Sequence, residues 1–196
     1  RPGETEIKNI KITRGGMDGK NVPYSGMVEP GIGYISLTTF TRDAGRNVAN
    51  ALRDLKTEST DLKGVILDLR GNGGGLLREA INVCNVFIPA EETVVTTRSK
   101  VVEADQEYKT RTEPVDTEIE LIVLIDENSA SASEIVSGVM QDLDRGVIIG
   151  QLSYGKGLVQ NTFDIGYNAK VKLTTSKYYI PSGRCIQSVE YKNGER

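Results

Sequence analysis

The residues best suited to chemistry lie in a serine-rich run at 128–134, Asn-Ser-Ala-Ser-Ala-Ser-Glu. An apolar, strand-like segment at 119–125 precedes the run, and a segment with apolar residues at helical spacing follows it. A side chain at such a strand-to-helix turn is exposed and rigidly held, which suits a nucleophile. The three serines of this run are therefore candidate nucleophiles.

A serine hydroxyl is a weak nucleophile at neutral pH, so it needs a base that takes its proton. The usual base is histidine. The chain has no histidine, so the common Ser-His-Asp triad is excluded. The remaining nitrogen base is a lysine kept neutral by burial. Lys156 is the candidate, since Gly155 and Gly157 flank it within an apolar stretch that includes Leu152 and Leu158. We expect this stretch to draw the amine out of water.

Both candidate features also have a simpler explanation. Ser131 with Glu134 three residues later is a capping-box signature, and a helix start needs such residues in any protein. Most lysines are solvated surface charges. Each feature taken alone is therefore explained without catalysis.

The two motifs together resemble one family. The serine run and the later Tyr-Gly-Lys-Gly-Leu-Val-Gln at 154–160 are similar to those of the C-terminal processing peptidases, also called tail-specific proteases. The similarity extends over residues 1–187. It implies a serine endopeptidase that forms an acyl-enzyme and acts on polypeptide substrates near their C-terminal tails. It also implies that Ser131 is the nucleophile, Lys156 the general base and Gln160 the residue that orients the lysine.

The role implied for Gln160 makes a geometric demand. Four residues along a flat strand separate Gln160 from Lys156 by about 13 Å, which is too far for a hydrogen bond. We therefore expect a bend or bulge, permitted by Gly157, that closes this gap.

A glycine-rich loop, Gly-Asn-Gly-Gly-Gly at 71–75, separates a predicted strand from a predicted helix. Acyl transfer places negative charge on the attacked carbonyl oxygen, and backbone N–H groups at a helix start can receive it. The resemblance implies that the N–H groups of Gly74 and Ala132 form this oxyanion hole. Gly73 stands where the family usually has proline, so the choice between Gly74 and Gly75 stays open. Alternatively, the glycines only permit a tight turn.

The elements around these motifs alternate between strands and helices, which indicates an α/β core with a mixed sheet. A helix carrying Val48, Ala51, Leu52 and Leu55 at helical spacing follows Thr41 and Asp43, either of which can cap it. Other predicted helices begin at Leu76 and after the serine run. The resemblance implies a fold of the ClpP and crotonase type, with spiralling ββα units and β-strands at both ends. Strands are predicted at 32–40, 63–70, 119–125, 146–149, 157–164, 169–176 and 178–180, with a turn at 166–168.

The domain organisation follows from the same resemblance. Residues 1–30, which include an alternating strand-like segment at 6–14, correspond to a strand segment leading out of a PDZ domain that this chain lacks. Residues 31–196 correspond to the peptidase core. The polar start of the chain suggests an excised fragment, with any targeting segment outside it.

Composition excludes several classes of protein. The 196 residues, 38% apolar and 26% charged, are typical of a globular protein with one core. A net charge of −3 disfavours nucleic acid as a partner, and no run approaches the roughly 20 apolar residues of a membrane helix. Without histidine, Cys84 and Cys185 match no familiar zinc site, and Cys84 is interpreted as a core residue. The peptidase interpretation implies no metal or other cofactor. The resemblance alone places the protein in the periplasm, or at a membrane on its extracytoplasmic side.

Three alternative functions remain. Residues 150–157 fit a phosphate-loop pattern except that Gly157 replaces its last Ser or Thr, and a strand-like segment follows instead of a helix. A dinucleotide site at Gly71 and Gly73 would need a third small residue where Leu76 stands. The third alternative is a catalytically inactive module of the same fold that binds an apolar ligand or a peptide.

Overall fold

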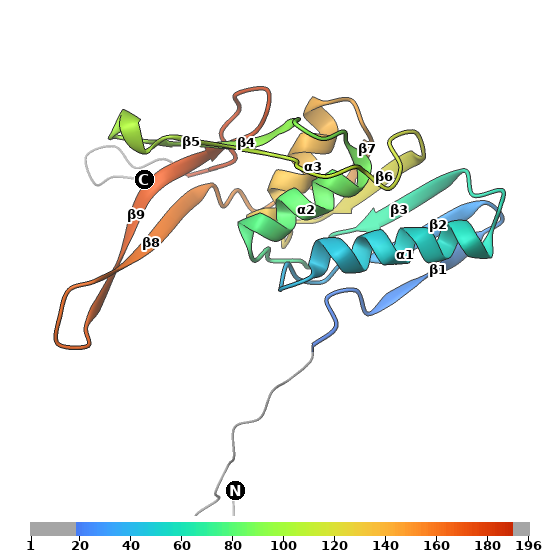
Figure 1. Cartoon of the computed structure of the whole chain (residues 1–196), viewed down its shortest axis with the longest axis horizontal. Coiled ribbons are helices and arrows are strands. Elements are labelled where there is room, and N and C mark those ends of the chain that lie inside the picture. The colour runs from blue at the N-terminus through green and yellow to red at the C-terminus, as the bar shows by residue number, and fades with distance from the viewer. Residues whose placement is uncertain (1–18, 190–196) are drawn as a thin grey trace, which may run out of the picture.

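The computed structural model describes residues 19–189 (Figure 1), so the strand predicted at 6–14 lies outside the described part. A five-stranded sheet forms one layer, in the order β1-β2-β3-β6-β7. The four strands from β2 to β7 run parallel, and β1 pairs antiparallel with β2 at one edge. The bounds of these strands are β1 Tyr24–Glu29, β2 Ile32–Ser36, β3 Gly64–Asp68, β6 Glu120–Ile125 and β7 Val147–Gly150.

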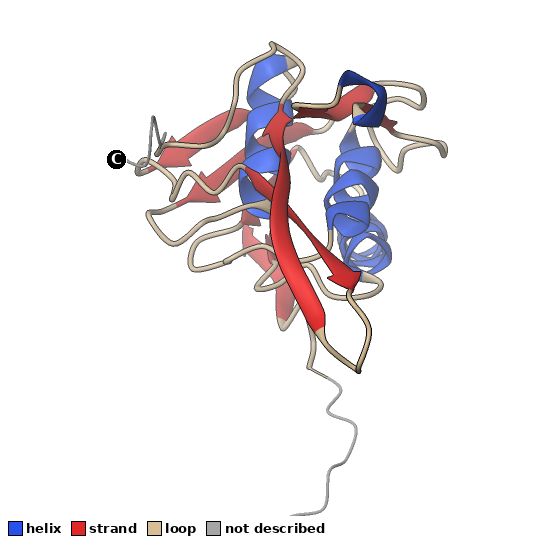
Figure 2. Cartoon of the chain, turned by 90° about the vertical axis from the view of Figure 1, so that its left-hand side faces the viewer, coloured by secondary structure: helices blue, strands red, loops and turns tan. Residues whose placement is uncertain are grey.

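A second sheet is wholly antiparallel, in the order β5-β4-β9-β8. A short 3-10 turn, Val102–Ala104, joins β4 to β5. The β8–β9 hairpin extends beyond the rest of the described chain, as Figures 1 and 2 show. These strands are β4 Thr93–Ser99, β5 Gln106–Lys109, β8 Leu158–Asp164 and β9 Lys170–Tyr179.

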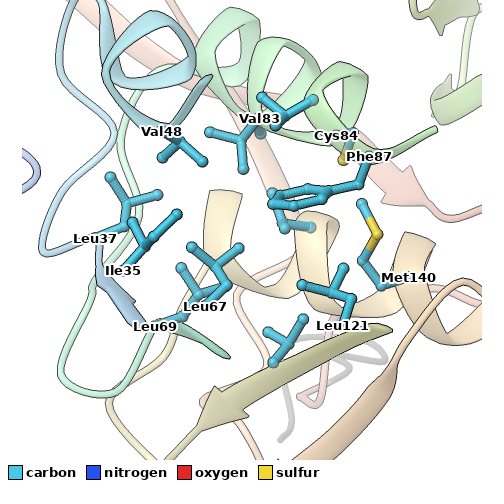
Figure 3. Close-up of a cluster of buried hydrophobic side chains, with 14 of the residues drawn as sticks. Ile35, Leu37, Val48, Leu67, Leu69, Val83, Cys84, Phe87, Leu121 and Met140 are labelled. Carbon is cyan, nitrogen blue, oxygen red and sulfur yellow. The ribbon is translucent and has the colours of Figure 1, made fainter. Parts of the chain in front are cut away.

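Three helices, α1 (Ala44–Glu58), α2 (Leu77–Phe87) and α3 (Ala132–Asp142), cross between parallel strands of the first sheet. Each buries one apolar face, as the helical spacing predicts. Figure 3 shows Val48 of α1, Phe87 of α2 and Met140 of α3 pointing toward side chains from the strands, among them Leu67 and Leu121. The core therefore lies between the helices and the parallel sheet.

The predicted elements are found with some changes at their ends. The strand predicted at 32–40 ends at Ser36, where the N–H of Leu37 turns to the carbonyl oxygen of Asp68. The strands predicted at 169–176 and 178–180 are one strand, β9, because Tyr178 and Tyr179 continue its pairing with β4. Strands β4 and β5 were not predicted.

The cap of α1 and the burial of Cys84 were also predicted. Asp43 occupies the N-cap position of α1 but makes no side-chain cap hydrogen bond. Cys84 is fully buried in α2, where burial raises the pKa of its thiol, and both cysteines are free. Within residues 19–189, the helices are too short and polar to cross a membrane.

Candidate active site

Three loops that follow neighbouring parallel strands form the candidate site. The glycine loop follows β3, the serine run follows β6, and the segment with Lys156 follows β7. The carboxyl ends of parallel strands meet at one edge of a sheet, where such folds usually bind ligands. Backbone hydrogen bonds join the loops directly, from Ala130 to Asn72 at 3.0 Å and from Tyr154 to Ser129 at 3.0 Å.

Ser131 stands at the N-cap of α3 in an unusual backbone conformation. Its φ of 56° and ψ of −110° lie where few residues other than glycine are found. Strain of this kind persists only where the surrounding structure enforces it, and it is common at functional sites. In the capping box the Ser131 hydroxyl oxygen faces the N–H of Glu134 as an acceptor, and among the residues that the structure describes the hydroxyl donates no hydrogen bond of its own. The hydroxyl is half-buried and is available for a reaction.

The two neighbouring serines are committed to structure. Ser129 is 0% exposed, and its hydroxyl donates to the carbonyl oxygen of Leu69 at 2.8 Å. Ser133 is also 0% exposed and donates to the carbonyl oxygen of Asn72 at 2.8 Å. Of the three candidate serines, only Ser131 therefore combines access to solvent with a hydroxyl proton that no described residue accepts.

The glycine loop lies directly against the serine turn. A Cβ on Gly74 would come within 2.6 Å of the carbonyl oxygen of Ala130 and 2.9 Å of the nitrogen of Ala132, so only glycine fits there. The φ of Gly74 is 95°, which also favours glycine. The close approach therefore explains more of the loop's composition than a tight turn alone.

Two backbone donors in this part of the site are free. Within the described part of the chain, the N–H groups of Ala132 and Gly75 have no acceptor, whereas the N–H of Gly74 donates to Oδ1 of Asn72 at 2.9 Å. Gly74 thus lies where the resemblance places it, but its N–H would have to leave Asn72 to receive an oxyanion. Gly75 offers its N–H without that change.

Glu134 joins the serine turn to the lysine loop. This side chain is 4% exposed, and its Oε2 accepts the N–H of Ser131 at 2.7 Å and the N–H of Lys156 at 2.8 Å. The two nitrogens are therefore at most 5.5 Å apart, the sum of those distances. Its Oε1 accepts the hydroxyl of Ser153 at 2.8 Å and the N–H of Gly155 at 2.6 Å. One buried carboxylate thus holds the two motifs together.

Lys156 itself differs from the expectation of burial. Its flanking glycines are buried, but its side chain is exposed. The glycines are needed because the chain near the C-terminus packs against them: a Cβ on Gly155 would collide with Ser188, and one on Gly157 with Gln187. Gln187 also accepts the N–H of Gly157 at 2.8 Å. The expected apolar surroundings are not formed, because Leu152 and Tyr154 are themselves exposed, and the amine of Lys156 lies in solvent.

Gln160 lies on β8, and the predicted irregularity is present. The pairing of β8 with β9 shifts register between Val159 and Gln160, which marks a bulge. The side chain of Gln160 is exposed and makes no hydrogen bond to Lys156 or to any other described residue. A bulge is therefore present, but it does not bring Gln160 into hydrogen-bond contact with Lys156, and the orienting role of Gln160 stays a prediction.

A charged cluster fixes the start of the glycine loop. Asp68, at the end of β3, accepts hydrogen bonds from Arg70 at 2.7 Å and from the hydroxyl of Tyr34 at 2.5 Å. Burial opposes ionisation of this carboxyl, but the hydrogen bonds from Arg70 and Tyr34 outweigh burial and hold the pKa of Asp68 below its ordinary value. The same pairing raises the pKa of Arg70. The cluster therefore stays charged at neutral pH and anchors the loop.

Asp126 connects the loops after β3 and β6. Its Oδ1 accepts the N–H of Gly71 at 2.9 Å and the N–H of Asn128 at 3.0 Å. The hydrogen bond from Gly71 is the main cause of a lowered pKa at Asp126. The carboxylate is thus a fixed acceptor between the two loops.

Asn72 and Glu134 are the site residues whose roles the sequence did not reveal. Asn72 is fully buried, donates to the carbonyl oxygen of Leu37 at 2.7 Å and accepts the N–H of Gly74. Glu134 was recognised only as part of a capping box. The available signal was a polar residue in an otherwise small or apolar run, which does not reveal its partners.

The structure also bears on the nucleotide and metal alternatives. Lys156 is followed by strand β8, whereas a phosphate loop requires a helix at that point. Between residues 19 and 189, no group of three or more His, Cys, Asp or Glu side chains is placed to hold a metal ion.

Comparison with known proteins gives consistent matches. The profile of peptidase family S41 matches residues 31–192. A carboxy-terminal-processing protease of Bartonella bacilliformis is 42% identical over 96% of this chain, and a carboxyl-terminal-processing protease of Synechocystis is 39% identical over 81%. The chain covers only 43% and 36% of those two proteins.

The fold also matches a solved structure. The photosystem II D1 C-terminal processing protease has a TM-score of 0.73 and 30% identity, over 80% of this chain and 39% of that one. This likeness confirms the predicted α/β core and its mixed sheet.

Proposed function

The chain belongs to peptidase family S41, and on that basis we propose that it is the core of a serine endopeptidase of the C-terminal processing type. Its substrates are polypeptides, which it cleaves near their C-terminal tails. The observation that carries the proposal is the shared acceptor Oε2 of Glu134, which binds the N–H groups of Ser131 and Lys156. A nucleophile and a nitrogen base are thereby held on adjoining loops.

In the proposed reaction, the hydroxyl of Ser131 attacks the peptide carbonyl and Lys156 accepts its proton. The free N–H of Ala132, together with one from the Gly74–Gly75 pair, stabilises the oxyanion. The proton then passes to the leaving amine, and water hydrolyses the acyl-enzyme by the reverse sequence. Gln160 positions the lysine at the bulge in β8.

The exposure of Lys156 adds a condition to this mechanism. A lysine in water is protonated at neutral pH and cannot take a proton from serine. We therefore propose that a bound polypeptide covers Lys156 and removes the water around its amine, because desolvation favours the neutral form. The base then becomes competent only when substrate is present.

Exposure of Lys156 equally favours a second candidate, a module that binds polypeptides without cleaving them. One experiment separates the two candidates. The chain and its Ser131→Ala variant are incubated with an unfolded polypeptide, and new termini are sought by mass spectrometry. The peptidase proposal expects new termini near the polypeptide's C-terminus from the parent chain only. If the polypeptide binds to both proteins and no new termini appear, the protein is the binding module and not a peptidase.

The compartment is part of the same proposal. By family resemblance, the protein acts in the periplasm or at a membrane on the extracytoplasmic side. Fractionation of the producing cells, with detection of the protein by antibody, tests this placement, and recovery with cytoplasmic markers contradicts it.

A further inference from the structure

A groove runs along the exposed side of α2 and begins beside the candidate site. Its volume is about 560 Å³. Helix α2 starts at Leu77, directly after the glycine loop and the half-exposed Leu76. We call it the α2 groove, and its floor and walls include Leu77, Arg78, Ile81, Tyr108, Lys109 and Arg111.

The charges in the α2 groove have one sign. Arg78, Lys109 and Arg111 line it, and no Asp or Glu does. Arg78 and Arg111 are exposed and form no ion pair within the described chain. Lys109 has a long contact to Glu107 at 3.9 Å, and Glu107 is not part of the lining. Three cations thus face this groove in a chain whose net charge is −3.

The remaining lining suits a polypeptide. Leu77, Ile81 and Tyr108 are partly buried apolar side chains that pack on the core and leave a surface in the groove. Asn82 provides an exposed amide beside them, whereas the amide of Asn85 is buried and hydrogen-bonded to Arg111 and Thr112. An apolar floor with a few polar groups is typical of ligand-binding clefts.

The length of α2 along the groove sets the number of substrate residues that the groove can hold. Residues 77 to 85 of α2 span about 12 Å at 1.5 Å per residue. An extended polypeptide covers that length with about four residues at 3.3 Å each. A substrate held at Ser131 and continuing along α2 therefore places about four residues in the groove.

We propose that the α2 groove binds carboxylate-bearing residues of the polypeptide substrate, within about four residues of the cleaved bond. Arg78 and Arg111 attract the carboxylates, and the apolar floor receives the intervening side chains. The inference deepens the proposed function and rests on it only for the identity of the polypeptide as substrate.

Binding tests this inference without any cleavage. The probes are two fluorescein-labelled decapeptides that differ only in four consecutive residues, Glu in one and Gln in the other. Their affinity for the full chain carrying Ser131→Ala is measured by fluorescence anisotropy at low and at high salt. We expect the acidic peptide to bind about fivefold more tightly at low salt, a modest preference because exposed charge pairs contribute little. High salt should remove it.

Two double variants test whether the acidic peptide binds in the α2 groove. Arg78→Gln with Arg111→Gln should abolish the preference for the acidic peptide. The control, Lys63→Gln with Lys172→Gln, changes the net charge equally at exposed sites outside the groove and should retain the preference. Equal binding of both peptides, or equal effects of both double variants, overturns the inference. If the groove variant is less stable but keeps its preference for the acidic peptide, the two arginines support the fold and do not bind the peptide. That result also overturns the inference.

The inference and the proposed function fail in different ways. Cleavage by the parent chain with no preference for acidic sequences leaves the peptidase and removes the role of the groove. A charge preference in binding without any cleavage leaves the groove and removes the peptidase.

Discussion

Replacing Glu134 by glutamine tests whether one carboxylate assembles the site. The glutamate accepts four hydrogen bonds, two at each oxygen, from Ser131, Lys156, Gly155 and the hydroxyl of Ser153. In glutamine one oxygen becomes an NH₂ group, which is a donor, so at least two of these donors lose their acceptor. The glutamine oxygen that remains is uncharged, so it accepts more weakly than the carboxylate from the N–H groups that still contact it.

The expected magnitude follows from those contacts. A hydrogen bond to a charged group contributes about 1.5 to 3 kcal/mol, so losing two lowers the free energy of unfolding by roughly 3 to 6 kcal/mol. Because the side chain is 4% exposed, water cannot easily replace the lost acceptor. Peptide hydrolysis should fall even where the variant is folded, since the loops of Ser131 and Lys156 then lose part of what holds them in place and keep the hydrogen bond from Tyr154 to Ser129.

Urea unfolding followed by circular dichroism measures the stability, and hydrogen exchange of the Ser131, Gly155 and Lys156 amides reports the local contacts. Glu58→Gln is the matched control, because Glu58 is exposed at the end of α1. If Glu134→Gln unfolded at the same urea concentration as the control and kept its amide protection, the carboxylate would not be what joins the loops.

Three further predictions concern neighbouring groups. Ser131→Ala should abolish hydrolysis, whereas Ser129→Ala and Ser133→Ala should keep much of it and lower stability by about 0.5 to 1.5 kcal/mol each, because each loses a buried hydrogen bond to a carbonyl oxygen that keeps one backbone donor; an inactive but stable Ser133→Ala with active Ser131→Ala would reassign the nucleophile. The rate of hydrolysis should rise from neutral to alkaline pH, and Lys156→Arg should be inactive at every pH because guanidinium does not release its proton; activity in that variant removes lysine from the mechanism. Asp68 has a lowered pKa in the folded chain, so its contribution to stability is present above the unfolded value of about 3.9 and is lost as the pH falls below it. Asp68→Asn should therefore reduce stability at pH 7 and flatten its fall between about pH 4 and 2, as followed by urea midpoints.

Much of the fold was predictable because its strands and helices have clear periodic patterns. The run Val65, Ile66 and Leu67 indicated a strand covered on both faces, and it forms β3 at the centre of the parallel sheet. Strands β4 and β5 were missed although Thr93–Ser99 is rich in β-branched residues. The pairing of β4 with β9, some 80 residues later, leaves no local signal, and β5 pairs only with β4 at the edge of the sheet.

The site was predictable in its parts and less so in its geometry. The motifs indicated Ser131, Lys156 and the glycine loop, and the structure places all three at the carboxyl ends of adjoining strands. The exposure of Lys156 was not predictable from its apolar neighbours. The two buried glycines pack against Gln187 and Ser188, whereas Leu152 and Tyr154 are exposed and the lysine side chain between the glycines lies in solvent.

The capping box and the catalytic site first appear as competing explanations of Ser131 and Glu134, but the structure joins them. A helix start requires an acceptor for its free N–H groups, and Glu134 supplies one to Ser131. The same carboxylate is buried because the loop after β7 covers it, and that loop provides the N–H groups of Gly155 and Lys156. A capping residue satisfied by solvent could not hold a second loop. The cap of α3 therefore brings the candidate base to the candidate nucleophile, and a short local motif in the sequence acquires a long-range role in the fold.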